Sequence, residues 1–513
     1  MSTSAKPSAV DASDDRHAGT RAGRHPGIVL TLLVTCYLMI TVDNTVVTIA
    51  LPQIRDSLGF SPTGLSWVLS AYTLTFGGLL LLGGRAGDVL GHRRTFVWGV
   101  WLFTVCSLLG GLATEPWMLL AARAVQGVGA AIASPGGMSL LITNFEEGPG
   151  RNRALAVYST LAGLGMATGM ILGGVLTEWA SWRWVLFVNV PFGLAVALLT
   201  PRYVAGSRPH PGRLDLVGAL IGTAGVSGLV YGFIRVGSDG WGDPLALAAF
   251  AVGAVLLAAF LTLQTRADTP LLPLGLFANR NRAAGYATVL LSMATLFSAL
   301  FFISQFLQGP LRFSPVRAGL AFLPMAFGMF GMSRLTPKLL PLIGARVLIT
   351  AGITLVTGGA LWLSRLTADS SYALGIAGPT ILLGIGIGSF LMPLNALILS
   401  GVPAREAGAA SGTMQTMQQV GGALGLAVLV TVYGTALGGS RTPQAVAHAT
   451  ADAFIGATVF AAAGLLLVLT AIRVPKRPAP PAAQADNYAR VTKAAWPSPA
   501  APASPFGASP TST

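Results

Sequence analysis

The sequence predicts an all-α polytopic membrane protein, and three observations lead to this fold class. The 513 residues are 53% hydrophobic and only 10% charged, whereas a soluble domain carries about a quarter charged residues. Fourteen apolar runs each approach the roughly 20 residues that cross the hydrocarbon core of a bilayer as a helix. Lys and Arg lie mainly in the short loops between these runs, so membrane topology explains the net charge of +14 better than nucleic-acid binding does.

The fourteen predicted spans form a set of six, a pair and a second set of six. They are 28–51, 65–84, 95–113, 117–142, 153–177, 183–200, 215–235, 244–264, 283–308, 316–337, 345–364, 372–399, 407–434 and 451–472. Because the number is even, both termini lie on one side of the membrane. Lys and Arg favour the loops on that side by about three to one, which predicts that both termini are cytoplasmic.

An internal repeat relates the two sets of six spans. A shift of about 254 residues places the first span on the ninth, and Pro149-Gly150-Arg151 on Pro403-Ala404-Arg405. Both halves begin on the same side, and transporters built from such parallel repeats bind substrate at the midplane between them. We therefore predict five segments: a cytoplasmic tail (1–26), an N-terminal six-helix bundle (27–200), a linker with two extra transmembrane helices (201–280), a C-terminal six-helix bundle (281–475) and a disordered cytoplasmic tail (476–513).

Two charged residues, Asp43 and Arg123, lie within predicted spans, where ionisable side chains are rare and usually functional. Gln126 follows Arg123 by three residues and so shares its helix face. By helical rise both charges lie in the outer halves of their spans, so they could meet across the N-terminal bundle. Two alternatives remain: Asp43 faces a water-filled vestibule without titrating, and Arg123 extends to the outer surface.

The loop after the second span contains Gly84, Asp88, Gly91, Arg93 and Arg94. Glycines allow a tight connection between antiparallel helices, and an Asp can accept hydrogen bonds from free amides at a helix N-terminus. The two arginines alone would be explained by a positively charged cytoplasmic loop.

Glycines recur every four residues in the fifth span, at Gly165, Gly169 and Gly173, with Gly174 beside the last. Such a stripe lets another helix backbone approach closely, so packing is its default interpretation.

Uncharged polar side chains in the spans are candidates for a substrate cavity, and Gln415, Gln418 and Gln419 share one helix face. No acid lies deep in the last six spans, which favours neutral, monocationic or anionic substrates. The candidates are Asn44, Gln126, Asn189, Gln305, Gln308, Asn395, Gln415, Gln418 and Gln419.

Together these residues resemble the fourteen-helix drug:proton antiporter family of the major facilitator superfamily. The loop resembles its signature Gly-x-x-x-Asp-x-x-Gly-x-Arg-Arg, and the segments 43–52 and 119–131 resemble its first-helix and fourth-helix motifs. The glycine stripe resembles the exporter motif, except that Met170 replaces a proline. The resemblance implies the major facilitator fold, proton coupling by Asp43 and Arg123, and a conformational role for the loop.

We accordingly expect a proton-driven exporter of a drug, antibiotic or apolar metabolite in the bacterial cytoplasmic membrane. It should act as a monomer without cofactor or metal. The alternative is proton-coupled or facilitated transport of another small metabolite, because a fold does not decide direction. An enzyme is disfavoured because all five histidines lie in tails or loops, and an ATP-driven pump because no phosphate-loop motif occurs. Cys36 and Cys106 lie in apolar runs, which argues against a disulfide framework.

Overall fold

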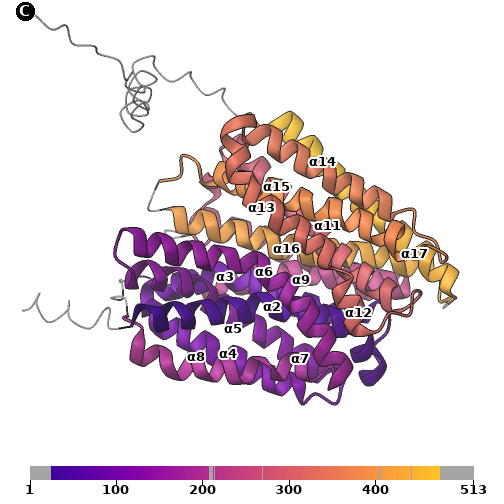
Figure 1. The fold of residues 1–513 in the computed structure, drawn as a ribbon, viewed down its shortest axis with the longest axis horizontal. Helices are drawn as coiled ribbons and strands as arrows, with labels where there is room; N and C mark the ends of the chain where they lie inside the picture. Colours follow the sequence, from indigo (N-terminus) through magenta and orange to yellow (C-terminus); the bar gives the residue numbers. More distant parts are fainter. Residues whose placement is uncertain are drawn as a thin grey trace, which may run out of the picture. The chain divides into compact units, whose positions relative to one another are not determined.

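The computed structural model describes residues 25–206, 209, 212, 214–267, 270–403, 406–440 and 442–473, with the side chains of 159–164 excepted, and contains no strand within them (Figure 1). The predicted tails at 1–26 and 476–513 therefore lie almost wholly outside the described residues, as do Ala404 and Arg405 of the repeat. All described helices belong to one compact unit that ends at Ile472.

Every predicted span coincides with one helix or with two consecutive helical segments. The elements are α2 (Pro26–Leu58), η1 (Gly64–Ser66), α3 (Trp67–Leu90), α4 (His92–Gly111), α5 (Pro116–Asn144), α6 (Pro149–Trp179), α7 (Trp184–Phe187), α8 (Asn189–Tyr203), α9 (Leu216–Asp239), α10 (Pro244–Arg266), η2 (Leu274–Phe277), α11 (Arg280–Gln308), α12 (Pro315–Leu320), α13 (Leu323–Ile343), α14 (Ala345–Leu363), η3 (Ala373–Ala377), α15 (Gly378–Leu399), α16 (Ala407–Leu437) and α17 (Pro443–Ala471). Among the described residues, 13 candidate spans are long and apolar enough to cross a membrane. The number fourteen and the cytoplasmic termini stay predictions.

Local sequence signals fix where several helices begin. Proline occupies the first turn of α2, α5, α6, α10, α12 and α17, where its missing N–H costs nothing. Five other side chains accept a hydrogen bond from the third amide of the helix that follows them, as N-cap residues do. They are Asp215, Asp243, Asn279, Ser314 and Thr442.

The helices of the predicted N-terminal bundle pack mainly on one another, α2 against α5, α6 and α8, and α3 and α4 against α5. Later in the chain, α11 packs against α16 and α17, α14 against α15 and α17, and α13 against α15 (Figure 1). The extra helices α9 and α10 pair with each other, and α9 also contacts α3 and α16. Direct contacts of α3 with α16 and of α6 with α12 join the two sets.

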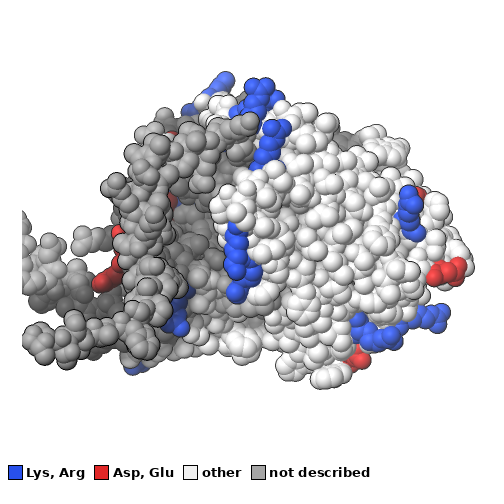
Figure 2. Space-filling model, turned by 45° about the horizontal axis from the view of Figure 1, so that its top comes forward, with Lys and Arg blue, Asp and Glu red and all other residues white. Residues whose placement is uncertain are grey.

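The surface fits a lipid environment. On the face shown in Figure 2, Lys and Arg gather in separate groups with a broad uncharged area between them. Four exposed tryptophans, Trp117, Trp179, Trp184 and Trp241, lie at helix ends that the predicted topology places on the outer side. Tryptophan is enriched at membrane–water interfaces, so these residues mark the expected outer boundary of the hydrocarbon core.

Candidate functional site

Asp43 of α2 lies at the centre of a buried polar network, with 1% of its surface exposed. Its Oδ2 accepts a hydrogen bond from Nη1 of Arg123 on α5. Its Oδ1 accepts hydrogen bonds from Nε2 of Gln126 at 2.9 Å and from Nδ2 of Asn189 on α8 at 2.8 Å. The two charges that the sequence places in separate spans therefore meet.

The Arg123 guanidinium is fully buried and has further partners. Its Nε donates to the Val68 carbonyl of α3 at 3.1 Å, and its Nη1 donates to Oε1 of Gln126 at 2.8 Å. Its carbon lies 4.4 Å from the centre of the Tyr72 ring, within range of a cation–π contact. Arg123 thus does not extend to the outer surface. A buried ion pair is tolerated only with such additional hydrogen bonds, because both charges have left water.

Gln126 belongs to this network and does not line the substrate cavity predicted for it. Both ends of its amide are occupied, because Nε2 also donates to Ser107 Oγ of α4 at 2.8 Å. Asn189, expected to face substrate, likewise donates to Asp43 instead. The spacing of three residues between Arg123 and Gln126 already signalled a shared face, whereas no sequence signal links Asn189 to Asp43.

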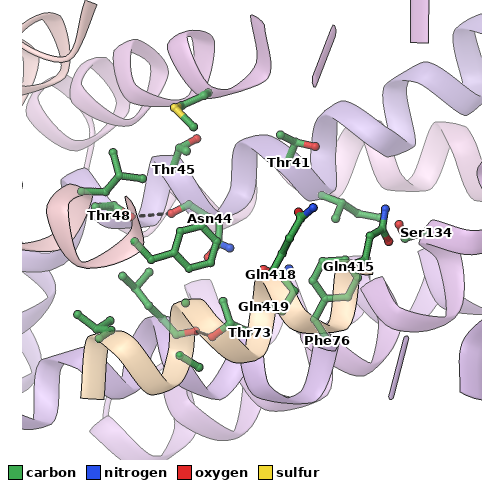
Figure 3. Close-up of a pocket in the computed structure, with 18 of the residues that line it drawn as sticks. Thr41, Asn44, Thr45, Thr48, Thr73, Phe76, Ser134, Gln415, Gln418 and Gln419 are labelled. Carbon is green, nitrogen blue, oxygen red and sulfur yellow. Dashed lines mark hydrogen bonds between the residues drawn. The ribbon is translucent and has the colours of Figure 1, made fainter. Parts of the chain in front are cut away.

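A separate cavity of about 230 Å³ opens between α2, α3, α5, α6, α11 and α16 (Figure 3). Four of the predicted cavity residues line it: Asn44, Gln415, Gln418 and Gln419. Gln305 does not; it lines a smaller pocket of about 30 Å³ beside Arg55 and Tyr433. The remaining wall is apolar or carries hydroxyl groups, and no charged side chain of the described residues lines this cavity.

Asp43 does not line the cavity, although its neighbour Asn44 does. Successive side chains point about 100° apart around an α-helix. One face of α2 therefore presents the carboxylate to α5 and α8, while the adjacent face forms the cavity wall.

The glycine stripe of α6 packs against α2 along this same segment. A Cβ at Gly173 would lie 2.8 Å from the Val46 carbonyl oxygen, and one at Gly169 would lie 3.1 Å from the Val42 carbonyl oxygen. Gly165 faces Thr41, whereas Gly174 faces the start of α12. The stripe therefore provides the close helix approach expected of it, and α6 continues as a helix through Met170.

The loop with the signature pattern is a tight connection between α3 and α4. Gly91 alone separates the two helices and has φ +92°, a conformation that favours glycine. Asp88 lies in the last turn of α3, not at a helix N-terminus as predicted, and its Oδ1 lies 3.4 Å from His92 Nε2. The single-residue connection leaves no room for Asp88 to precede α4.

The arginines of this loop differ in their contacts. Arg93 Nη1 donates to the Val204 carbonyl oxygen at 3.1 Å, at the C-terminal end of α8. Arg94 is exposed. Gly84 lies on α3 facing Pro135 of α5, with 3.8 Å from a Cβ placed on it to the nearest proline carbon. The loop thus joins α3, α4 and the end of α8.

Hydrogen bonds join the two sets of helices beyond the cavity residue Thr48. Ser304 Oγ and Gln308 Nε2 of α11 donate to the carbonyl oxygens of Thr48 and Ile49 on α2, at 3.0 and 2.9 Å. The Val316 amide of α12 donates a hydrogen bond to Oε2 of Glu178 at 2.8 Å. Glu178 lies on α6 shortly after Gly174, which also faces the start of α12. In the predicted topology these contacts lie on the outer side of the membrane.

Comparison with known proteins supports a transport fold. The model of the Major Facilitator Superfamily matches residues 33–426. The cephamycin export protein CmcT of Amycolatopsis lactamdurans is 45% identical over 86% of this chain and 91% of its own length. The puromycin resistance protein of Streptomyces alboniger is 41% identical over 85% and 89%. A bacterial homologue of the lysosomal transporter Spinster, solved in an inward-facing, unoccupied conformation, has a TM-score of 0.62 over 88% of this chain and 99% of its own; at 15% identity it supports the fold alone.

Proposed function

Since the chain belongs to the major facilitator superfamily, it is a multi-pass transporter of small molecules, and we propose that it exports an antibiotic or similar apolar metabolite in exchange for protons. The proposed export direction follows from the relatives, one of which is an export protein for cephamycin and another a resistance protein for puromycin.

The observation that carries the proposal is the buried pair of Asp43 and Arg123. The carboxylate accepts three hydrogen bonds, from Arg123, Gln126 and Asn189. A proton that reaches Asp43 removes its charge, and with it the ionic attraction that holds Arg123. The network can therefore switch between a paired and an unpaired arrangement, as a proton-driven cycle requires. Each proton that crosses 100 mV supplies about 2.3 kcal/mol.

The test begins with a drug-susceptibility panel in an efflux-deficient bacterial host. The compound to which the protein gives most resistance is then followed in inverted membrane vesicles with an imposed proton gradient. We expect uphill accumulation that collapses with an uncoupler in the wild type and that is absent in Asp43→Asn. The matched control is Asp56→Asn, the same change at an exposed position of the same helix, which should accumulate drug normally.

Undiminished accumulation by Asp43→Asn would refute the coupling role. Transport that runs only down a concentration gradient, or only into cells, would instead support the alternative of facilitated or inward transport on the same fold.

A further inference from the structure

The threonine hydroxyl groups of the cavity wall have no hydrogen left for a substrate. Each of four threonines donates to the carbonyl oxygen three or four residues earlier on its own helix, at 2.8 to 3.1 Å: Thr41, Thr45, Thr48 and Thr73. A hydroxyl used in this way keeps only its acceptor lone pairs. These threonines therefore offer acceptors and methyl groups to the cavity.

The amide groups of the cavity are in the opposite state. Asn44, Gln415, Gln418 and Gln419 make no side-chain hydrogen bond to any described residue. Each offers two N–H donors and a carbonyl acceptor. Figure 3 shows Asn44 on α2 and the three glutamines on α16, so the amides approach the space from two different helices. Gln419 is buried and Gln418 half-buried, so a ligand that satisfies them gains more than it would at a surface.

The described cavity wall carries no charged side chain, which favours an uncharged ligand. A cation would lose its hydration without meeting a carboxylate, and an anion would face the acceptor oxygens of the threonines. A carboxamide suits both sets, because its N–H groups match the free acceptors and its carbonyl matches the glutamine donors. Phe76 and Phe297 add aromatic surface to the wall, which suits a flat apolar ring.

We propose that this cavity selects uncharged molecules that carry a primary or secondary carboxamide on a flat apolar body, with Asn44, Gln418 and Gln419 as the specificity residues. The inference rests on the proposed function, since it names the substrate class of the same transport site.

The test measures equilibrium binding of matched naphthalene probes to the purified full-length protein in lipid nanodiscs. The probes are 2-naphthamide, N,N-dimethyl-2-naphthamide, methyl 2-naphthoate, 2-naphthoate and trimethyl(2-naphthylmethyl)ammonium. We expect 2-naphthamide to bind at least about tenfold more tightly than the other four, because only this probe has amide N–H groups. An equal or tighter affinity for the ester, the ammonium or the carboxylate would overturn the inference, as would the absence of binding by all five probes.

Two variants assign the selectivity to the amides. Gln418→Leu should lower the affinity for 2-naphthamide about tenfold and leave that for the ester unchanged. Gln305→Leu is the matched control, because it makes the same change outside this cavity, and it should keep the wild-type ratio of affinities. An unchanged ratio in Gln418→Leu would overturn the assignment.

Equilibrium binding needs no proton gradient, so this test fails independently of the proposed function. Asp43→Asn should show the wild-type preference for 2-naphthamide while losing proton-driven transport. If the wild type shows proton-driven transport but no preference for 2-naphthamide, only the proposed substrate class is overturned. If the wild type prefers 2-naphthamide but its transport does not depend on protons, only the proposed proton coupling is overturned.

Discussion

The buried pair predicts a large coupling free energy between Asp43→Asn and Arg123→Met. Removing one member of a buried ion pair typically costs about 3–5 kcal/mol, because the other charge stays buried without its partner. The surviving hydrogen bonds favour the lower value: the carboxylate would keep Gln126 and Asn189, and the guanidinium would keep the Val68 carbonyl. We therefore expect a loss of about 3 kcal/mol of unfolding free energy for each single variant.

The double variant contains neither charge, so its loss should be only about 2 kcal/mol, from imperfectly paired amides. The two single losses add to about 6 kcal/mol, and the difference gives a coupling free energy of roughly 4 kcal/mol, above the usual range for residues in contact.

The measurement is a denaturant titration of the purified protein, followed by tryptophan fluorescence, for the wild type, both single variants and the double variant. A control cycle uses Arg55→Met and Asp56→Asn, whose side chains also pair, at 2.9 Å, but are 39% and 69% exposed. That cycle should give a coupling of less than about 1 kcal/mol. If the double variant at Asp43 and Arg123 lost the full sum of the two single variants, the account of the buried pair would be refuted. Asp43→Asn, Arg123→Met and their double variant should all fail to drive uphill transport.

Three further outcomes are expected. Gly169→Val should lower the unfolding free energy by about 1–3 kcal/mol through overpacking against α2, whereas Gly27→Ala, with open space around it, should not lower it; equal losses in the same titration would contradict the close approach. Glu178→Gln weakens the bond to the first turn of α12, so hydrogen–deuterium exchange at the facing ends of α6 and α12 should become several-fold faster; unchanged exchange would show that this bond does not hold the two helix ends together. The hydrogen bond from Arg235 lowers the pKa of Asp243, so this carboxylate stabilises the start of α10 above its ordinary pKa of about 3.9 and the stabilisation is lost as the pH falls through the lowered value. Thermal unfolding should therefore show a loss of stability in this acid range that is absent in Asp243→Asn.

The positions of the spans could be predicted because lipid demands long apolar helices, and each predicted run does fall on a helix. Their ends and breaks could not. α2 runs from Pro26 to Leu58, beyond the predicted 28–51, because its last turns continue past the apolar run. The predicted spans 183–200 and 316–337 each consist of two helical segments. Hydropathy records burial in lipid, not backbone hydrogen bonding, so it does not register such breaks.

The site was partly predictable for a similar reason. Two ionisable groups in lipid must find partners, and the similar depth of Asp43 and Arg123 in their spans allowed their meeting to be predicted. The assignment of Gln126 to the cavity was wrong because the rotation of α5 about its axis decides which face meets the cavity, and polar residues lie on more than one face of such a helix. The glutamines of α16 could be predicted to line the cavity because all three amides lie on one helix face. A face with three amides is expected to turn away from lipid.

The positions of Asp43 and Asn44 bear on how a proton and a substrate would communicate. Asp43 is buried against α5 and α8, whereas Asn44 lines the cavity. In this conformation a bound substrate would not touch the carboxylate, so the two ligands would not compete for one group. Coupling would have to pass through movement of α2, which the smooth glycine surface of α6 permits and the bonds from Ser304 and Gln308 restrain at the outer end. A transporter coupled in this way needs no charge on its substrate, which agrees with a cavity whose described wall carries none.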